Sequence, residues 1–123
     1  MAGKRILFVD DDEMMLEAIP EMLESLGYEV IPQTGERCAA SGITPKDRWV
    51  PDLIIADSSA GSKIEHVLKE RALRHEPGIP VVFMTVPWEN FTPEIRTPWK
   101  VVYKPFTKAE LVAALHGAWE GAA

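Results

Sequence analysis

The sequence has little cysteine, fewer basic than acidic residues, and no long apolar run. Its 123 residues include one cysteine, Cys38, which cannot form a disulfide within the chain. A lone thiol is the ordinary pattern of a reducing cytoplasm. Lysine and arginine total 13 against 19 aspartates and glutamates, and the formal net charge is -6. This balance argues against nucleic acid as a direct ligand, because phosphate binding needs a basic patch.

Membrane and secretory signals are also missing from the sequence. No apolar stretch approaches the roughly 20 residues of a membrane-spanning helix, and Met1 to Arg5 leads into an apolar run without a signal-peptide pattern. We therefore expect a cytoplasmic protein that does not bind membranes. Hydrophobic residues make up 46% of the chain. That content and length suit one core, so we expect a single domain over residues 1–123 with no output domain.

Short apolar runs alternate with helical patterns along the chain. The predicted strands are 4–9, 28–32, 52–57, 79–85 and 100–104. The predicted helices are 12–26, 35–42, 63–75 and 108–119. Alternation of this kind predicts an α/β fold with a parallel sheet and right-handed crossovers.

One expected helix is interrupted by prolines. A helix is due between the last two strands, yet Pro87, Pro93 and Pro98 fall there. Each proline inside a helix costs about 3 kcal/mol. We therefore predict an irregular loop over 86–99, with at most one or two helical turns around 93–97.

Polar residues stand where four of the predicted strands end. They are Asp10 and Asp11 after the first strand, then Asp57, Thr85 and Lys104. Open parallel sheets build their sites at the carboxyl ends of the strands. Carboxylates gathered there repel one another, and a divalent cation such as Mg²⁺, which prefers hard oxygen ligands, is the usual offset. The sequence thus predicts a magnesium site at this edge.

Together these motifs resemble the CheY-like receiver domains of two-component response regulators. The resemblance covers nearly the whole chain and rests on four motifs in order, which are Leu7–Asp12, Pro51–Asp57, Pro80–Thr85 and Lys104–Phe106. It implies a flavodoxin-like, doubly wound sheet of five parallel strands in the order 2-1-3-4-5, with helices on both faces. With the prolines above, it also implies a degenerate fourth helix.

The resemblance assigns a role to each polar residue. Asp57 would be the phosphoacceptor, phosphorylated by a histidine kinase or a histidine phosphotransfer protein. Thr85 would be the switch hydroxyl and Lys104 the cation that pairs with Asp57 and then with the phosphoryl group. The implied cofactor is Mg²⁺, held by Asp10, Asp11, Asp57 and the backbone carbonyl of Ser59. Asp12 would stand at the start of the first helix, where a carboxylate favours the helix dipole.

The resemblance also implies partners. We expect the exposed start of the first helix, with Met14, Met15 and Ala18, to dock the phosphoryl donor. Phosphorylation would then change Thr85 and the 86–99 loop and switch the binding of an unknown downstream protein. The chain would be a phosphoacceptor regulator and not an enzyme, beyond assisting its own phosphorylation and dephosphorylation.

Some positions depart from the family pattern. Gly61 replaces a usual proline, and Val86 is bulkier than the usual small residue. The family's aromatic switch position is Val101 here, whereas Tyr103 lies next to Lys104 and is expected to face the opposite side of the strand.

Two other functions remain open on the sequence. A pseudo-receiver would be a phosphorylation-independent interaction module that keeps the site as a structural relic. A haloacid-dehalogenase type phosphohydrolase would want a second aspartate two residues after the nucleophile, where Ser59 stands.

Overall fold

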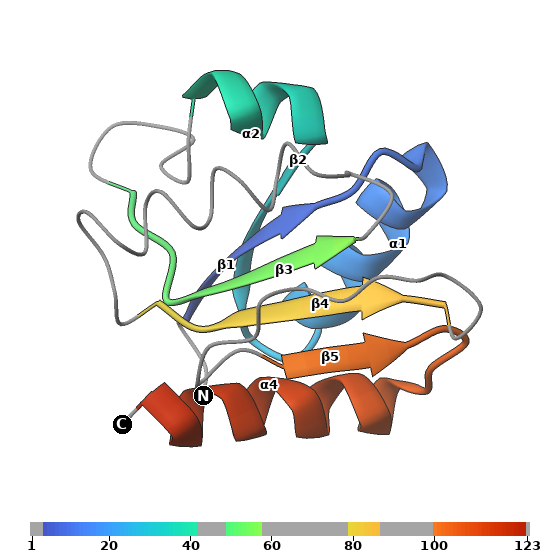
Figure 1. The fold of residues 1–123 in the computed structure, drawn as a ribbon, viewed down its shortest axis with the longest axis vertical. Helices are drawn as coiled ribbons and strands as arrows, with labels where there is room; N and C mark the ends of the chain where they lie inside the picture. The colour runs from blue at the N-terminus through green and yellow to red at the C-terminus, as the bar shows by residue number, and fades with distance from the viewer. Residues whose placement is uncertain (1–3, 42–48, 58–78, 87–99, 123) are drawn as a thin grey trace.

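The computed structural model describes residues 4–41, 49–57, 79–86 and 100–122, and these form alternating strands and helices (Figure 1). The elements are β1 (Arg5–Val9), α1 (Glu13–Glu24), β2 (Glu29–Gln33), α2 (Gly35–Ser41), β3 (Leu53–Asp57), β4 (Val81–Thr85), β5 (Lys100–Tyr103) and α4 (Lys108–Ala122). Each matches a predicted element to within a few residues. The helix predicted over 63–75, and the loop predicted over 86–99 beyond Val86, lie outside the described residues. Among the described helices, none is long and apolar enough to cross a membrane.

The five strands form one parallel sheet in the order β2-β1-β3-β4-β5, as predicted. In Figure 1 the arrowheads of β1, β3, β4 and β5 therefore point to the same side of the molecule. β2 is an edge strand, and this explains how it accommodates Pro32, which has no N–H to donate to a neighbouring strand.

Two hydrophobic clusters lie on opposite faces of the sheet. One joins β-strand side chains such as Phe8 and Ile55 to Leu23 of α1 and Leu115 of α4. The other includes Cys38 of α2. Because β3 and β4 are buried at every position, they show the continuous apolar runs of parallel strands that are covered on both faces. Helices thus cover both faces, which confirms the predicted doubly wound arrangement.

Local signals fix the ends of the helices beside the sheet. Asp12 caps α1, since its Oδ1 accepts a hydrogen bond from the Met14 N–H at 2.9 Å. After α1, Gly27 has a φ of 97°, and the Tyr28 N–H donates back to the Leu23 carbonyl at 3.2 Å, which is the usual closure on a left-handed glycine.

A capping box stands at the start of α4. Thr107 Oγ1 accepts a hydrogen bond from the Glu110 N–H at 3.1 Å, and Glu110 Oε1 accepts one from the Thr107 N–H at 3.1 Å. Two N–H groups that the helix cannot satisfy internally are thereby satisfied. The box sets where α4 begins after β5.

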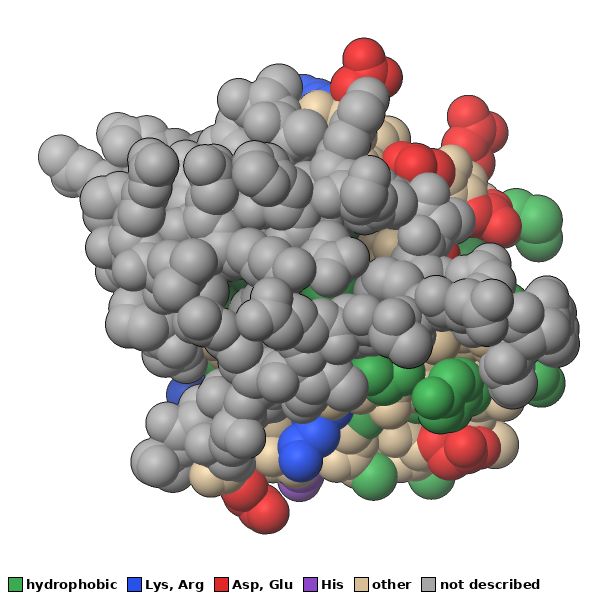
Figure 2. Space-filling view, viewed as in Figure 1, with side chains coloured by type: hydrophobic (Ala, Val, Ile, Leu, Met, Phe, Trp, Pro, Cys, Tyr) green, Lys and Arg blue, Asp and Glu red, His purple; other side chains and the backbone are tan. Residues whose placement is uncertain are grey.

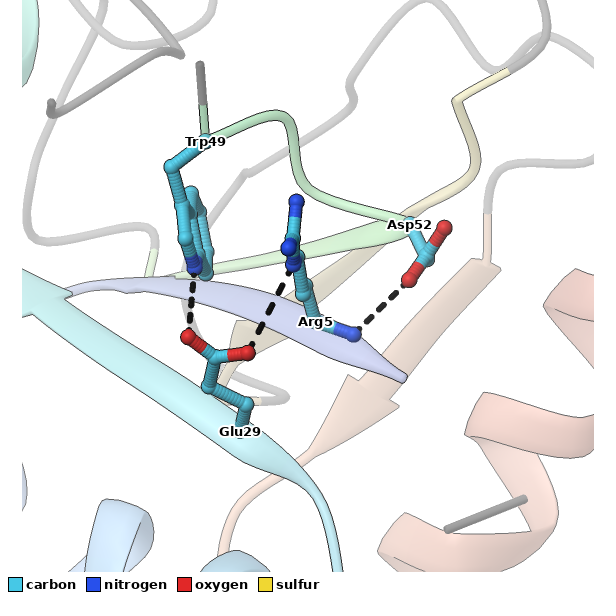
Figure 3. A network of polar contacts seen from close by, with 4 residues as sticks. All are labelled: Arg5, Glu29, Trp49 and Asp52. Atoms are coloured by element: carbon cyan, nitrogen blue, oxygen red, sulfur yellow. Dashed lines mark hydrogen bonds and ion pairs between the residues drawn. The ribbon is translucent and has the colours of Figure 1, made fainter. Parts of the chain in front are cut away.

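A polar network ties the amino edge of the sheet together (Figure 3). Glu29 of β2 accepts a hydrogen bond from Trp49 Nε1 at 2.9 Å and pairs with Arg5 Nε of β1 at 3.5 Å. The Arg5 N–H donates to Asp52 Oδ2 at 2.8 Å. Trp49 is buried, so its ring belongs to the core while its N–H bonds Glu29. This network lies at the edge opposite the polar strand ends.

The C-terminal part of α4 reaches the same edge. Trp119 Nε1 donates to the Asp52 carbonyl at 3.2 Å, and the Trp119 ring stacks on Tyr28 with 5.7 Å between centroids. The two tryptophans therefore fix the amino edge from both faces.

Candidate functional site

The parallel register brings the predicted site residues to one edge of the sheet. Asp57, the last residue of β3, lies opposite Met84 of β4, and Thr85 lies opposite Tyr103 of β5. Val9 lies opposite Ala56, which places Asp10 beside the end of β3. Neighbouring strands thus deliver two carboxylates, a hydroxyl and, after β5, an ammonium group to one edge.

An ion pair joins two of these groups. Lys104 Nζ contacts Asp57 Oδ2, and the Asp57 side chain is 2% exposed whereas that of Lys104 is 28% exposed. The Lys104 backbone N–H also donates to the Thr85 carbonyl at 2.6 Å, which holds the segment after β5 against the end of β4. A buried carboxylate therefore sits beneath a lysine that solvent can reach.

Asp10 is a second buried carboxylate at this edge. Its Oδ1 accepts a hydrogen bond from the Asp12 N–H at 2.9 Å, whereas its buried Oδ2 has no hydrogen-bond partner within the described residues. Burial raises the pKa of Asp10 above its ordinary value, the Asp12 N–H opposes that rise, and the charges of Asp57 and Lys104 raise and lower the pKa respectively. These electrostatic effects place Asp10, Asp57 and Lys104 within one site.

Asp11 is directed elsewhere. Its side chain is exposed, and Oδ1 accepts a hydrogen bond from the Gly35 N–H at 2.9 Å, at the junction of β2 and α2. Across the described part of the chain, no three His, Cys, Asp or Glu residues are grouped so that they could hold a metal ion. In this arrangement Asp11 does not join Asp10 and Asp57, so its role as a ligand stays a prediction.

Asp10 and Asp57 by themselves suit Mg²⁺. This ion usually takes one or two carboxylates and keeps several waters. The unpartnered Oδ2 of Asp10 is an acceptor that a cation would satisfy, and the ion would also offset the repulsion between Asp10 and Asp57. Ser59, predicted to add its backbone carbonyl, lies outside the described residues.

Thr85, the predicted switch residue, is 1% exposed at the end of β4. Tyr103 beside it in β5 is 55% exposed. The expectation that Tyr103 faces the opposite side of the strand from position 101 was wrong: residues two apart share a face, and Val102 between them packs into the α4 cluster.

The surface around the site is acidic. Figure 2 shows acidic side chains gathered on the right, where Figure 1 places the start of α1 and the carboxyl end of β1. The exposed acids of this segment are Asp11, Asp12 and Glu13. Clustered charge of one sign raises the local concentration of cations.

Comparisons with known proteins agree with the geometry. No family model matches the chain. The chain is 32% identical over 123 residues to the phosphate regulon transcriptional regulatory protein PhoB of Pseudomonas aeruginosa, an alignment that covers 94% of the chain and 51% of that protein. The chain spans about half the length of the curated relatives it matches.

Solved structures share the fold. The receiver domain of the sensor histidine kinase PA1611 from Pseudomonas aeruginosa, which holds a magnesium ion in its active site cleft, matches with a TM-score of 0.75 at 24% identity, over 97% of the chain and 99% of that domain. The chemotaxis protein CheY4 of Vibrio cholerae matches with a TM-score of 0.70 at 22% identity, over 95% of the chain and 99% of CheY4.

Fold and strand order define a flavodoxin-like, doubly wound α/β domain. Within that class, the chain is similar in sequence to the regulator PhoB and shares its fold with CheY-like receiver domains of two-component systems. The resemblance found in the sequence is thereby confirmed.

Proposed function

We propose that the chain is a Mg²⁺-dependent phosphoacceptor, in which Asp57 receives a phosphoryl group from a histidine kinase or a histidine phosphotransfer protein. The observation that carries the proposal is the buried Asp57 carboxylate, paired with Lys104 and next to the unpartnered oxygen of Asp10. A carboxylate held in this way is a nucleophile whose charge is already balanced by groups suited to phosphoryl oxygens.

The transfer itself needs positioning and charge stabilisation more than acid–base chemistry. An Asp57 oxygen forms a bond to phosphorus as the phosphorus–nitrogen bond of the donor phosphohistidine breaks, and the imidazole leaves with the electron pair and takes up a proton. Lys104, a compact cation, can shift from the carboxylate to the new phosphoryl oxygens. Bound Mg²⁺, held by Asp10 and Asp57, would supply positive charge against those oxygens. The magnesium ion in the PA1611 receiver domain supports this reading by likeness of fold.

Thr85 is the proposed reporter of phosphorylation. It ends β4, and its carbonyl is bonded to the Lys104 N–H. A phosphoryl group on Asp57 introduces acceptor oxygens that a hydroxyl at the end of the neighbouring strand can bond. A change at Thr85 would be passed to Val86 and the residues that follow it, and so to a downstream partner.

The proposed docking surface for the phosphoryl donor is the start of α1. Met14 is 79% exposed there, and Ala18 is exposed one turn later, whereas Met15 packs partly against the core. An exposed methionine is an adaptable contact for a partner helix. A partner kinase of two-component type would phosphorylate the chain in the cytoplasm. We propose that the chain acts there as a regulator and not as an enzyme with multiple turnover.

A second candidate, the phosphorylation-independent interaction module, is favoured by one observation. Asp11 is bonded to Gly35 and does not complete a three-carboxylate group with Asp10 and Asp57. Such a module would bind partners without taking up phosphate or Mg²⁺.

Beryllofluoride, a tetrahedral mimic of a phosphoryl group on a carboxylate, separates the two candidates. We expect ¹⁹F NMR to show a bound signal on the wild type with Mg²⁺, and none on Asp57→Asn or after chelation. A bound signal on Asp57→Asn would remove Asp57 as the acceptor. Absence of the signal from the folded wild type would favour the interaction module.

A further inference from the structure

We propose that Mg²⁺ binding is coupled to the junction of β2 and α2, because the Asp11 carboxylate must leave the Gly35 amide to reach the ion. The inference rests on the proposed function, since it takes Mg²⁺ as the cation of this site. It goes beyond that function by linking the metal site to α2, a helix that contributes no residue to the proposed phosphorylation.

The contact between Asp11 and Gly35 joins two connections of the sheet. Asp11 follows β1, and its Oδ1 lies 2.9 Å from the Gly35 nitrogen, although the two residues are 24 apart in the chain. The backbone nearby is joined as well, because the Asp10 N–H donates to the Gln33 carbonyl at 3.1 Å. Two adjacent strand ends are therefore linked by one backbone bond and one side-chain bond.

Gly35 is a position where this bond matters to α2. The first N–H groups of a helix have no acceptor within it. Thr34 satisfies one of them, since its Oγ1 accepts from the Arg37 N–H at 3.2 Å. Asp11 satisfies the N–H of Gly35, the first residue of α2. The start of α2 thus depends on a side chain from the acidic segment after β1.

The same carboxylate is wanted by the metal site. Asp10 offers a buried oxygen without a partner, beside Asp57, and Asp11 would add a third carboxylate to the two that can already hold the ion. With Asp11 bonded to Gly35, the described residues hold no group of three such ligands. For Asp11 to join Asp10 and Asp57, its side chain would have to turn away from Gly35, so binding of the ion by Asp11 and closure of the junction oppose each other.

Linkage makes this opposition reciprocal: whatever weakens the Asp11–Gly35 bond strengthens Mg²⁺ binding. The effect would extend into the fold, because Cys38 of α2 is buried in the same cluster as Leu7 and Val9 of β1. A metal-bound state would therefore differ from the metal-free state at the start of α2.

Two variants of Gly35 separate the hydrogen bond from other effects. Gly35→Pro removes the N–H at the first helical position, where proline is well tolerated. Gly35→Ala keeps the N–H and is the matched control. We expect Gly35→Pro to bind Mg²⁺ about three- to tenfold more tightly than wild type, as for loss of one competing charged hydrogen bond, and Gly35→Ala to stay within about twofold of wild type.

The wild type gives a readout that needs no variant. In ¹⁵N-amide NMR with MgCl₂, the Gly35 amide signal should move, and its hydrogen exchange should quicken, at the same midpoint as the amides of Asp57 and Thr85. If the site amides respond, Gly35 stays fixed and Gly35→Pro binds like wild type, the coupling is wrong and the phosphoacceptor proposal stands. If no amide responds to Mg²⁺, both fail.

Discussion

Lys104 covers Asp57: the two form an ion pair in which the carboxylate is 2% exposed and the lysine 28% exposed. A buried charge is costly unless an opposite charge remains near it. Because the lysine reaches solvent, it can be drawn away by new oxygens without moving the strand that holds Asp57. The pair therefore stabilises the unphosphorylated fold, and Lys104 can still change partners when a phosphoryl group is added.

Loss of Lys104 should destabilise the fold through Asp57. In Lys104→Met the stem is retained while the cation that balances the buried carboxylate is lost, so we expect the free energy of unfolding to fall by about 1–3 kcal/mol, allowing for partial exposure of the lysine. Urea denaturation measures this. Adding Asp57→Asn to Lys104→Met should recover most of the loss, and strictly additive effects would contradict the pairing.

Asp10→Asn should make the protein more stable at neutral pH. The amide keeps an acceptor for the Asp12 N–H while it removes a buried charge beside Asp57, and we expect a gain of about 1 kcal/mol in thermal unfolding together with weaker Mg²⁺ binding. Asp12→Asn is the control, because asparagine caps α1 as well as aspartate does. A loss of stability in Asp10→Asn alone would oppose the account.

The pH dependence of the wild type should carry the same signature. The pKa of Asp10 is raised in the fold above its ordinary value of 3.8, so the native state holds this proton more tightly than the unfolded state. The contribution of Asp10 to stability is therefore full below pH 3.8 and is lost as pH rises through the raised native value. The difference in stability between Asp10→Asn and wild type should grow over that window, and a difference independent of pH would exclude it.

Two glycine substitutions should have opposite signs. Gly27→Ala places a Cβ at a φ of 97° and should cost about 1 kcal/mol. Gly117→Ala lies within α4, where an added Cβ meets Lys100 Cε at 3.8 Å, an ordinary contact, and should add about 0.5–1 kcal/mol. Thermal melts of the two variants side by side test the expectation, and equal signs would refute it.

Trp49→Phe should weaken the amino edge without touching the site. The change keeps an aromatic ring in the core but removes the donor to Glu29, so we expect a loss of about 1 kcal/mol in urea denaturation. Beryllofluoride binding should remain at the wild-type level. Loss of beryllofluoride binding in Trp49→Phe would show that the amino edge and the carboxyl edge of the sheet are coupled.

Much of this architecture could be predicted from local patterns. The strands β3 and β4 are continuous apolar runs because both of their faces are buried, and the Thr107–Glu110 box and Gly27 mark helix ends by backbone chemistry alone. The polar strand ends converge because parallel strands share one carboxyl edge.

What could not be predicted depends on pairs distant in the chain. The bond from Asp11 to Gly35 and the burial of Trp49 against Glu29 each join separate connections, and no periodicity or motif encodes such a contact. An acidic pair in sequence thus became one buried and one exposed carboxylate with different partners.

Asp57 is proposed to accept a phosphoryl group with the help of Mg²⁺. Intact-mass spectrometry after incubation with phosphoramidate and Mg²⁺, on wild type and on Asp57→Asn, tests it most directly. We expect one added phosphoryl group on the wild type alone, and none after Mg²⁺ is chelated. An unmodified wild type, or equal modification of Asp57→Asn, would contradict it.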